Sequence, residues 1–285
     1  MKTKTRNILI ITAFAVAIII SFAAFGTYTY SSKHNSYKET ADGYGIASYK
    51  SISTEDTFTV PDTYEGKPVT EIMAFSFANS EYLKELYIGA NIRAIDIWAL
   101  TNCPLLEKIS VDDNNPYFSS VDGVLYNKDQ TELLCYPNGK TPLETDKDGN
   151  VTGGGTLVLP NTVVSIRTNA FYMCTNLYGI TFNEGLKSVG DKAFLKCGNL
   201  QEINLPSTVE TIGTDAFSYC NAVKTLEIPA SVTSIGDYAF FSTSTQMEKI
   251  VVHKASEADL TLGKDWIPNQ ANSVNTKIPV EYVGA

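Results

Sequence analysis

Clusters of catalytic or metal-binding side chains are missing from this chain, which has only two histidines among its 285 residues. His34 and His253 stand far apart in the sequence, and we interpret both as exposed polar residues. Neither a Gly-x-Ser-x-Gly nucleophile turn nor a Walker A or Gly-x-Gly-x-x-Gly phosphate loop occurs. The five cysteines are 23 or more residues apart, unlike the close pairs of a zinc site. We therefore predict that the protein is not an enzyme and has no catalytic residue, no metal and no cofactor.

Positive charge is also in short supply, because 22 Lys and Arg residues face 31 Asp and Glu residues and the formal net charge is −9. Nucleic-acid binding requires clustered Lys and Arg side chains that displace counterions. Adsorption to an anionic lipid surface requires a basic patch for the same electrostatic reason. We therefore expect no nucleic-acid partner and no electrostatic adsorption to membranes.

One long hydrophobic run is present near the amino terminus, from Ile8 to Phe25, interrupted only by Thr12 and Ser21. It follows three basic residues, Lys2, Lys4 and Arg6. With 18 residues the run exceeds a usual signal-peptide core and just reaches the lower limit for a spanning helix. The basic flank predicts a cytoplasmic amino end. We predict that residues 1–26 are either a cleaved signal peptide or a membrane anchor, that residues 27–42 are a polar spacer, and that the remainder is exported, to be anchored at the cell surface or secreted.

What the chain has in abundance is a repeat with a period of 23 residues. It is marked by four pairs: Ala170-Phe171, Ala193-Phe194, Ala216-Phe217 and Ala239-Phe240. Each unit begins with an L-x-x-L-x-I pattern that predicts a half-buried strand, and a shorter V/L-x-x-V/I segment follows it. A fixed period of this length is typical of a stacked-repeat solenoid, in which each unit contacts only its neighbours. The solenoid is expected over residues 43–252, with the regularly placed Phe and Ile side chains in its core.

Cysteine recurs in step with the repeat at Cys174, Cys197 and Cys220. Neighbouring copies in such a stack lie about 5 Å apart, a distance that a disulfide could bridge. The same position holds Cys103 in an earlier unit and Thr243 in the last, so the position requires a small side chain more than it requires a bond. We therefore predict buried free thiols.

The period breaks between Val111 and Thr156. Two extended segments there, Val121–Tyr126 and Glu132–Pro137, flank a turn sequence and predict a β-hairpin that replaces a standard unit while the sheet continues. We assign an insert to residues 112–155, of which residues 141–155 are expected to be a mobile loop. Residues 253–285, which include Trp266, are expected to form a closing cap.

The run from Leu200 to Cys220 reads Leu-x-x-Ile-x-Leu-Pro-x-x-Val-x-x-Ile-x-x-x-Ala-Phe-x-x-Cys and resembles the BspA-type leucine-rich repeat. The segment Tyr64–Ile72 resembles the usual first unit of that family, and the predicted hairpin resembles its insert. The early units depart from the pattern, since Ser76-Phe77 replaces Ala-Phe and Trp98-Ala99-Leu100 lacks the Phe. The resemblance implies a β-rich leucine-rich-repeat solenoid, a curved right-handed stack of strand–turn–short-strand units. It also implies a surface protein of a family in which some members are implicated in adhesion to host matrix proteins or to other microbes.

The outward positions of the predicted strands are the candidate binding surface, because such a sheet lines the inner face of curved solenoids and often contacts partners. The candidate residues are Lys84, Glu85, Tyr87, Lys108, Ser110, Tyr178, Thr181, Gln201, Asn204, Lys224 and Glu227. The expected function is a cell-surface binding or adhesion module whose partner is a protein or glycan on a host or microbial surface. The alternative is a structural or spacer protein without a specific ligand, whose strand residues are merely solvated.

Overall fold

The computed structural model places Asn35–Ala285 in one compact unit. It describes residues 35–52, 54–141, 143–145, 151–154, 156–241, 247, 249–267 and 278–284. The predicted leader, residues 27–34 of the predicted spacer and Thr243 lie outside the described residues. Among the residues that are described, no helix is long and apolar enough to cross a membrane.

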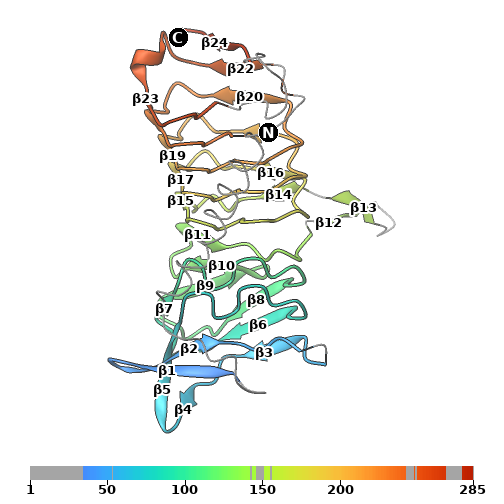
Figure 1. Cartoon of the computed structure of the whole chain (residues 1–285), viewed down its shortest axis with the longest axis vertical. Helices are drawn as coiled ribbons and strands as arrows, with labels where there is room; N and C mark the ends of the chain where they lie inside the picture. The colour runs from blue at the N-terminus through green and yellow to red at the C-terminus, as the bar shows by residue number, and fades with distance from the viewer. Residues whose placement is uncertain are drawn as a thin grey trace, which may run out of the picture. The chain divides into compact units, whose positions relative to one another are not determined.

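One side of the stack is a continuous row of very short parallel strands (Figure 1). These strands are β15 (Ser165–Ile166), β17 (Ser188–Val189), β19 (Thr211–Ile212), β21 (Ser234–Ile235) and β23 (Thr261–Leu262). Val189 pairs with Ile166 and with Ile212, so the register advances by one repeat from strand to strand. The second residue of each of the first four strands is a buried Ile or Val (Ile166, Val189, Ile212 and Ile235), so each short segment contributes one β-branched side chain to the core.

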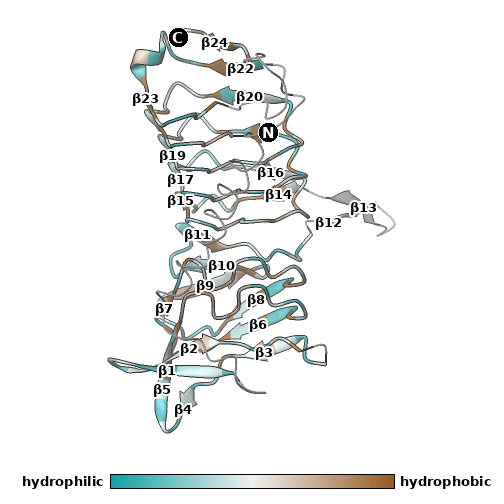
Figure 2. Ribbon diagram, in the orientation of Figure 1, coloured by the Kyte–Doolittle hydropathy of each residue, from teal (hydrophilic) through white to brown (hydrophobic). Residues whose placement is uncertain are grey.

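The other side of the stack carries the longer strands, which form three separate sheets. The first contains β3 (Thr57–Thr59), β6 (Glu85–Ile88) and β8 (Lys108–Val111), and the second β14 (Thr156–Val158) and β16 (Gly179–Thr181). The third contains β18 (Ile203–Asn204), β20 (Thr225–Ile228), β22 (Lys249–Val252) and β24 (Val280–Tyr282). In β6 and β20 exposed and buried residues alternate, as predicted, and hydrophilic and hydrophobic colours both occur within single strands of this row (Figure 2).

The amino-terminal end is closed by an antiparallel pair, β1 (Ser36–Thr40) and β2 (Gly43–Ser48). β2 then pairs in parallel with β5 (Lys67–Ile72), which also contacts β4 (Thr63–Tyr64) and β7 (Ala94–Ile95). Residues 36–40 were expected to be spacer, but Tyr37 stacks on Tyr64 and the strand covers the free edge of β2. Gly43 permits this approach, because its φ is 148° and an added Cβ would lie 2.1 Å from the carbonyl oxygen of Pro68.

The predicted hairpin is present as β10 (Val124–Asn127) and β11 (Glu132–Cys135), and β9 (Phe118–Val121) adds a third antiparallel strand. Since β11 pairs in parallel with β15, the short-strand sheet continues through the insert. The long-strand row does not continue, because β8 and β14 belong to different sheets. The predicted loop at 141–155 is also corrected, since β12 (Leu143–Thr145) pairs with β13 (Val151–Gly154). Residues 146–150, between these two strands, lie outside the described residues.

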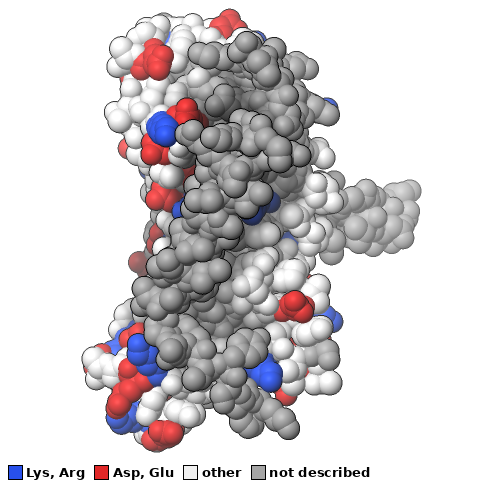
Figure 3. Space-filling view, in the orientation of Figure 1, with Lys and Arg blue, Asp and Glu red and all other residues white. Residues whose placement is uncertain are grey.

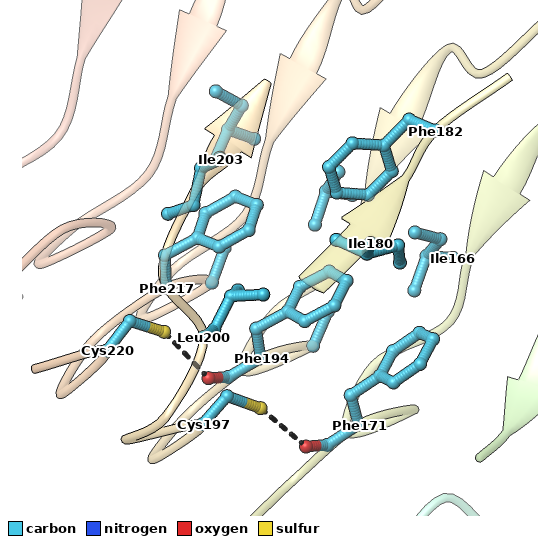
Figure 4. Packing of buried hydrophobic residues seen from close by; sticks show 14 of the residues in the cluster. Ile166, Phe171, Ile180, Phe182, Phe194, Cys197, Leu200, Ile203, Phe217 and Cys220 are labelled. Atoms are coloured by element: carbon cyan, nitrogen blue, oxygen red, sulfur yellow. Dashed lines mark hydrogen bonds between the residues drawn. The ribbon is translucent and has the colours of Figure 1, made fainter. Parts of the chain in front are cut away.

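The core is divided into two hydrophobic clusters, one from Ile46 to Leu134 and one from Val124 to Ile278. The second is built around a stack of phenylalanine rings, in which centroids lie 4.5 Å apart between Phe171 and Phe194 and 5.0 Å apart between Phe194 and Phe217 (Figure 4). These side chains are fully buried, so the predicted core assignment is confirmed.

The cysteines of the repeat are buried and free, as predicted, and so is Cys103. The thiol of Cys220 donates a hydrogen bond to the carbonyl oxygen of Phe194 at 3.3 Å (Figure 4). At the carboxyl end, β23 and β24 extend both rows beyond the predicted solenoid. A short 3-10 helix (Glu257–Asp259) precedes β23, and Trp266 and Ile278 are buried between β23 and β24 in the sequence, so the segment expected to be a cap adds further strands to the stack.

Candidate binding surfaces

We define the strand face as the outward side chains of β6, β8, β16, β18 and β20 together with the one or two exposed residues before each of these strands. All of the predicted binding residues lie on it, and all are exposed except Ser110, which is half-buried. Because the long-strand row is divided, they fall into three groups. The groups are Lys84, Glu85, Tyr87, Lys108 and Ser110 on the first sheet, Tyr178 and Thr181 on the second, and Gln201, Asn204, Lys224 and Glu227 on the third.

Several polar groups of the strand face are paired with one another or with side chains next to the face. Lys108 lies 3.6 Å from the carboxylate of Glu85, and His253 lies 3.3 Å from that of Glu227. The hydroxyl of Tyr87 donates to Asp112 at 2.7 Å, and this bond raises the pKa of Tyr87 and lowers that of Asp112. Acidic and basic side chains are intermixed on the face shown in Figure 3 rather than separated by sign. The charges of the strand face therefore stabilise neighbouring turns as well as facing solvent.

A groove of about 650 Å³ lies where the insert meets the first sheet of the strand face. Its lining includes Glu85, Lys108 and Ser110 from the predicted set. The insert contributes Asp122 and Lys140, whose charged groups lie 3.1 Å apart. Sequence reasoning missed these two residues because it treated the insert only as a replacement for a repeat unit.

The wall of this groove is shaped by the tight turn between β9 and β10. Asp122 and Gly123 have φ values of 49° and 75°, which a two-residue hairpin turn requires and which Asp-Gly favours. The carbonyl oxygen of Gly123 accepts a hydrogen bond from the amide of Ile109 at 2.9 Å, so the turn is fixed against the edge of β8. The β9–β10 turn that forms one wall of the groove is therefore hydrogen-bonded to β8, which forms the other wall.

A second surface feature lies beside the short-strand row, at the junction of the two hydrophobic clusters. The Arg167 guanidinium donates to the carbonyl oxygen of Ile95 at 2.7 Å, and the Asn169 amide donates to that of Ile97 at 3.3 Å. Burial lowers the pKa of Arg167. These side chains bridge the break in the repeat, and a notch of about 20 Å³ remains among them.

Aromatic side chains gather next to this notch. The rings of Phe75 and Trp98 stack with centroids 5.9 Å apart, Tyr172 meets Trp98 edge-on at 6.5 Å, and the amine of Lys192 lies 5.7 Å above the Trp98 ring. Phe75 is 60% exposed. Sequence reasoning did not identify this cluster, although the departure of Trp98 from the Ala-Phe pattern was a signal for it.

The thiols do not provide a reactive group. Burial raises the pKa of Cys103, Cys135 and Cys197 to about 12, and it raises the pKa of Cys174 and Cys220 well above the ordinary value. A thiol protonated at neutral pH is a weak nucleophile and a weak metal ligand. Within the described part of the chain, no group of three or more His, Cys, Asp or Glu side chains is placed to hold a metal ion.

Comparison with known proteins identifies the repeat. The family model for the BspA type leucine-rich repeat region matches in six copies, over residues 48–132 and 154–258. No curated protein matches the chain. Among solved structures, the pneumococcal vaccine antigen PcpA is similar with a TM-score of 0.61 and 21% identity, over 77% of this chain and 56% of that one. A leucine-rich repeat protein from Eubacterium ventriosum is similar with a TM-score of 0.52 and 26% identity, over 75% of this chain and 55% of that one. The chain thus spans little more than half the length of these two relatives.

Proposed function

The chain belongs to the BspA-type leucine-rich repeat family, and we propose that it is an exported, non-enzymatic surface protein that binds a partner protein through its strand face. The observation that carries the proposal is the groove where the insert meets β6 and β8. It adds depth and a fixed backbone wall to an otherwise open row of strands. Concave sites with a few placed polar groups are where proteins most often bind ligands.

Export is supported by the basic residues and the hydrophobic run at the amino terminus. It is also in keeping with the relatives, one of which is a vaccine antigen of pneumococcus. The non-enzymatic assignment is supported by the raised pKa of the buried thiols and by the family, whose repeat builds extended surfaces rather than closed active sites. Adhesion to a host or to another microbe is a role that uses both export and an extended, non-catalytic surface.

A second candidate function is a structural spacer that carries no ligand of its own. The ion pairs made by Glu85 and Glu227 of the strand face favour it, because paired charges stabilise neighbouring strands whether or not a partner is bound. The binding function requires a partner to contact exposed residues of the face such as Tyr87 and Thr181, which lie on separate sheets, whereas the spacer function does not.

The test is a binding assay of the full-length protein against host extracellular-matrix proteins and against whole microbial cells. The variant that combines Tyr87→Ala with Thr181→Arg is compared with the wild type, and the melting temperature of both is measured. A ligand that binds the wild type and is lost from the variant at unchanged melting temperature supports the proposal. Binding of no protein or cell in the panel favours the spacer function, and equal binding by both proteins contradicts a partner contact at Tyr87 and Thr181.

A further inference from the structure

The row of long strands is interrupted between β8 and β14. These strands begin successive turns of the stack, because β11 and β15, which follow them in the chain, pair with each other. β8 and β14 nevertheless belong to different sheets. An uninterrupted repeat would pair them, as β6 pairs with β8 one turn earlier. The interruption therefore leaves two strand edges within the row, one on β8 and one on β14.

The edge of β8 is covered by the insert. The amide of Ile109 donates to the carbonyl oxygen of Gly123 at 2.9 Å, and the amide of Val111 donates to Oγ of Ser120 at 3.1 Å. Both acceptors belong to β9 or to the turn that follows it. The insert thus bonds the backbone groups that a neighbouring strand would otherwise meet, which is one of the ways in which proteins protect a sheet edge.

The edge of β14 has no such cover. In the described part of the chain β14 pairs only with β16. The amide of Leu159 donates to the carbonyl oxygen of Thr181 at 3.0 Å. Because the backbone groups of alternate residues point to opposite sides of a strand, those of Thr156 and Val158 point away from β16. Neither residue forms a backbone hydrogen bond on that side with any other described residue.

The open edge also lacks the residues that usually protect one. Natural edge strands carry charged side chains, proline or a bulge, and β1 at the amino-terminal end follows this rule with Lys38 and Glu39. β14 reads Thr-Leu-Val, without a charge or a proline. Val158 is 68% exposed, the largest exposure of any large hydrophobic residue in the described chain. An uncharged strand edge beside an exposed valine is a template for a further strand.

These features determine what can bind. An extended peptide supplies N–H and C=O groups at the spacing of a strand, as in domains that bind peptides by strand addition. Because β14 carries no charge, an apolar or β-branched side chain beside Val158 fits better than a charged one. A second stack of this chain is hindered, because β12 and β13, which directly precede β14, project from the side of the stack (Figure 1). A single extended segment is therefore the occupant that fits.

We propose that β14 binds an extended segment of a partner protein, which adds to its sheet as a further strand. The segment pairs with the backbone of Thr156 and Val158 and places an apolar or β-branched side chain next to Val158. The groove of the strand face lies at the covered edge of β8, on the other side of the same interruption, so one partner can contact both. The inference rests on the proposed function, because it names how the partner of the strand face is held.

The probes are synthetic peptides with the sequences of residues 83–89, 106–112 and 223–229. They contain long strands of this repeat, which are the segments that pair with the equivalent edge in other turns. Copies in which every internal amide is N-methylated have no backbone donor to pair with β14 and serve as control peptides. Binding to the full-length protein is measured by titration and by the shift of the Val158 amide signal in NMR spectra.

Two variants alter the open edge and leave the pairing with β16 in place. Val158→Pro removes an N–H group that points away from β16, a position at which an edge strand tolerates proline. Val158→Lys adds a side chain that commonly protects strand edges. Val164→Lys is the matched control, because Val164 is also an exposed valine, at 42%, and lies outside the long-strand row. We expect at least one peptide to bind the wild type and the control, and to bind both Val158 variants at least about tenfold more weakly.

The proposal is overturned if no peptide binds the wild type, if the N-methylated copies bind as well as the originals, or if Val158→Pro binds like the wild type. Thermal unfolding identifies a variant that misfolds, and Val158→Lys then decides in place of Val158→Pro. Sedimentation of the wild type and of Val158→Pro tests for pairing between copies. Self-association that Val158→Pro prevents would make the occupant a second copy and would overturn the proposal.

The peptides bind or fail to bind whether or not the natural partner is present, so the two proposals fail separately. If no peptide binds while the strand-face variant loses its partner, only the strand addition at β14 is wrong. If the peptides bind while the strand-face variant keeps its partner, only the contact at Tyr87 and Thr181 is wrong.

Discussion

The thiol of Cys197 donates a hydrogen bond to the carbonyl oxygen of Phe171, which lies 3.0 Å away in the preceding turn. The same bond joins Cys220 to Phe194 at 3.3 Å and Cys103 to Phe77 at 3.1 Å. Cysteine in this repeat is therefore a small side chain whose thiol hydrogen bond links each turn to the preceding one. This role explains its periodicity without requiring a disulfide or a metal.

The phenylalanine stack makes the first prediction. Phe194 is fully buried, and its ring lies between those of Phe171 and Phe217. Phe194→Ala should lower the free energy of unfolding by about 3–5 kcal/mol, because it removes a large apolar side chain and leaves a cavity. Chemical denaturation measures this change. The exposed Tyr219→Ala serves as control, and equal stability of the two variants would show that the ring stack is not the core.

The thiols predict a loss of stability in alkali. Burial raises the pKa of Cys197 from 9.0 to about 12. Above pH 9 the unfolded chain releases this proton while the folded chain keeps it. The contribution of the protonated thiol to the free energy of unfolding is therefore fully present below pH 9 and falls as the pH rises toward 12. A shift of this size corresponds to about 4 kcal/mol. Denaturation at a series of pH values should give a shallower alkaline slope for Cys197→Ala than for the wild type, and parallel slopes would contradict the assignment.

Gly43 makes a prediction about the amino-terminal end. Its positive φ and the 2.1 Å approach to Pro68 leave no room for a side chain. Gly43→Ala should destabilise the protein by about 1–3 kcal/mol, since the backbone must shift or strain. Gly198→Ala is the control, because nothing lies within 4 Å of an added Cβ and its φ is unremarkable for an L-residue. A melting temperature that falls equally in both variants would contradict the close packing of β2 on β5.

Asn138 couples the two hydrophobic clusters. Its Oδ1 accepts from the amide of Cys103 at 2.9 Å, and its Nδ2 donates to the carbonyl oxygen of Tyr172 at 2.6 Å. Asn138→Ala leaves the buried amide of Cys103 unpaired, at a cost of about 1–3 kcal/mol, and removes the partner of the half-buried Tyr172 carbonyl. We expect the two clusters of the variant to unfold separately, so that the backbone amides of one cluster stay protected from hydrogen exchange longer than those of the other. The exposed Asn91→Ala should unfold as one unit, and the same single transition in Asn138→Ala would show that the clusters are joined by other contacts.

The repeat could be predicted from the sequence because one period fixes the core, and Phe171, Phe194 and Phe217 all occupy the positions that it assigns. The hairpin was predictable from its turn residues. The break between β8 and β14 was not, since strand pairing depends on how the insert fills space rather than on local pattern. Nor was β1, whose Tyr37 is positioned by contacts with Tyr64 far along the chain.

The candidate sites divide in the same way. Outward positions such as Glu85 and Lys108 follow from strand alternation and were predicted. Asp122 and Lys140 reach the groove only through the fold of the insert. Asn169 reaches the notch across the break in the repeat, 72 residues from its partner Ile97. Long-range placement of this kind leaves no periodic signal in the sequence.

The most direct test of the strand-face account exchanges the two charges of one ion pair in the groove. The double variant Glu85→Lys with Lys108→Glu keeps the internal pair and reverses the pattern that a partner meets. Affinity for whichever matrix protein or microbial cell binds the wild type should fall by at least about tenfold, because rim and groove charges determine complementarity, and the melting temperature should not change. Unchanged affinity at unchanged melting temperature would contradict the claim that this face binds the partner.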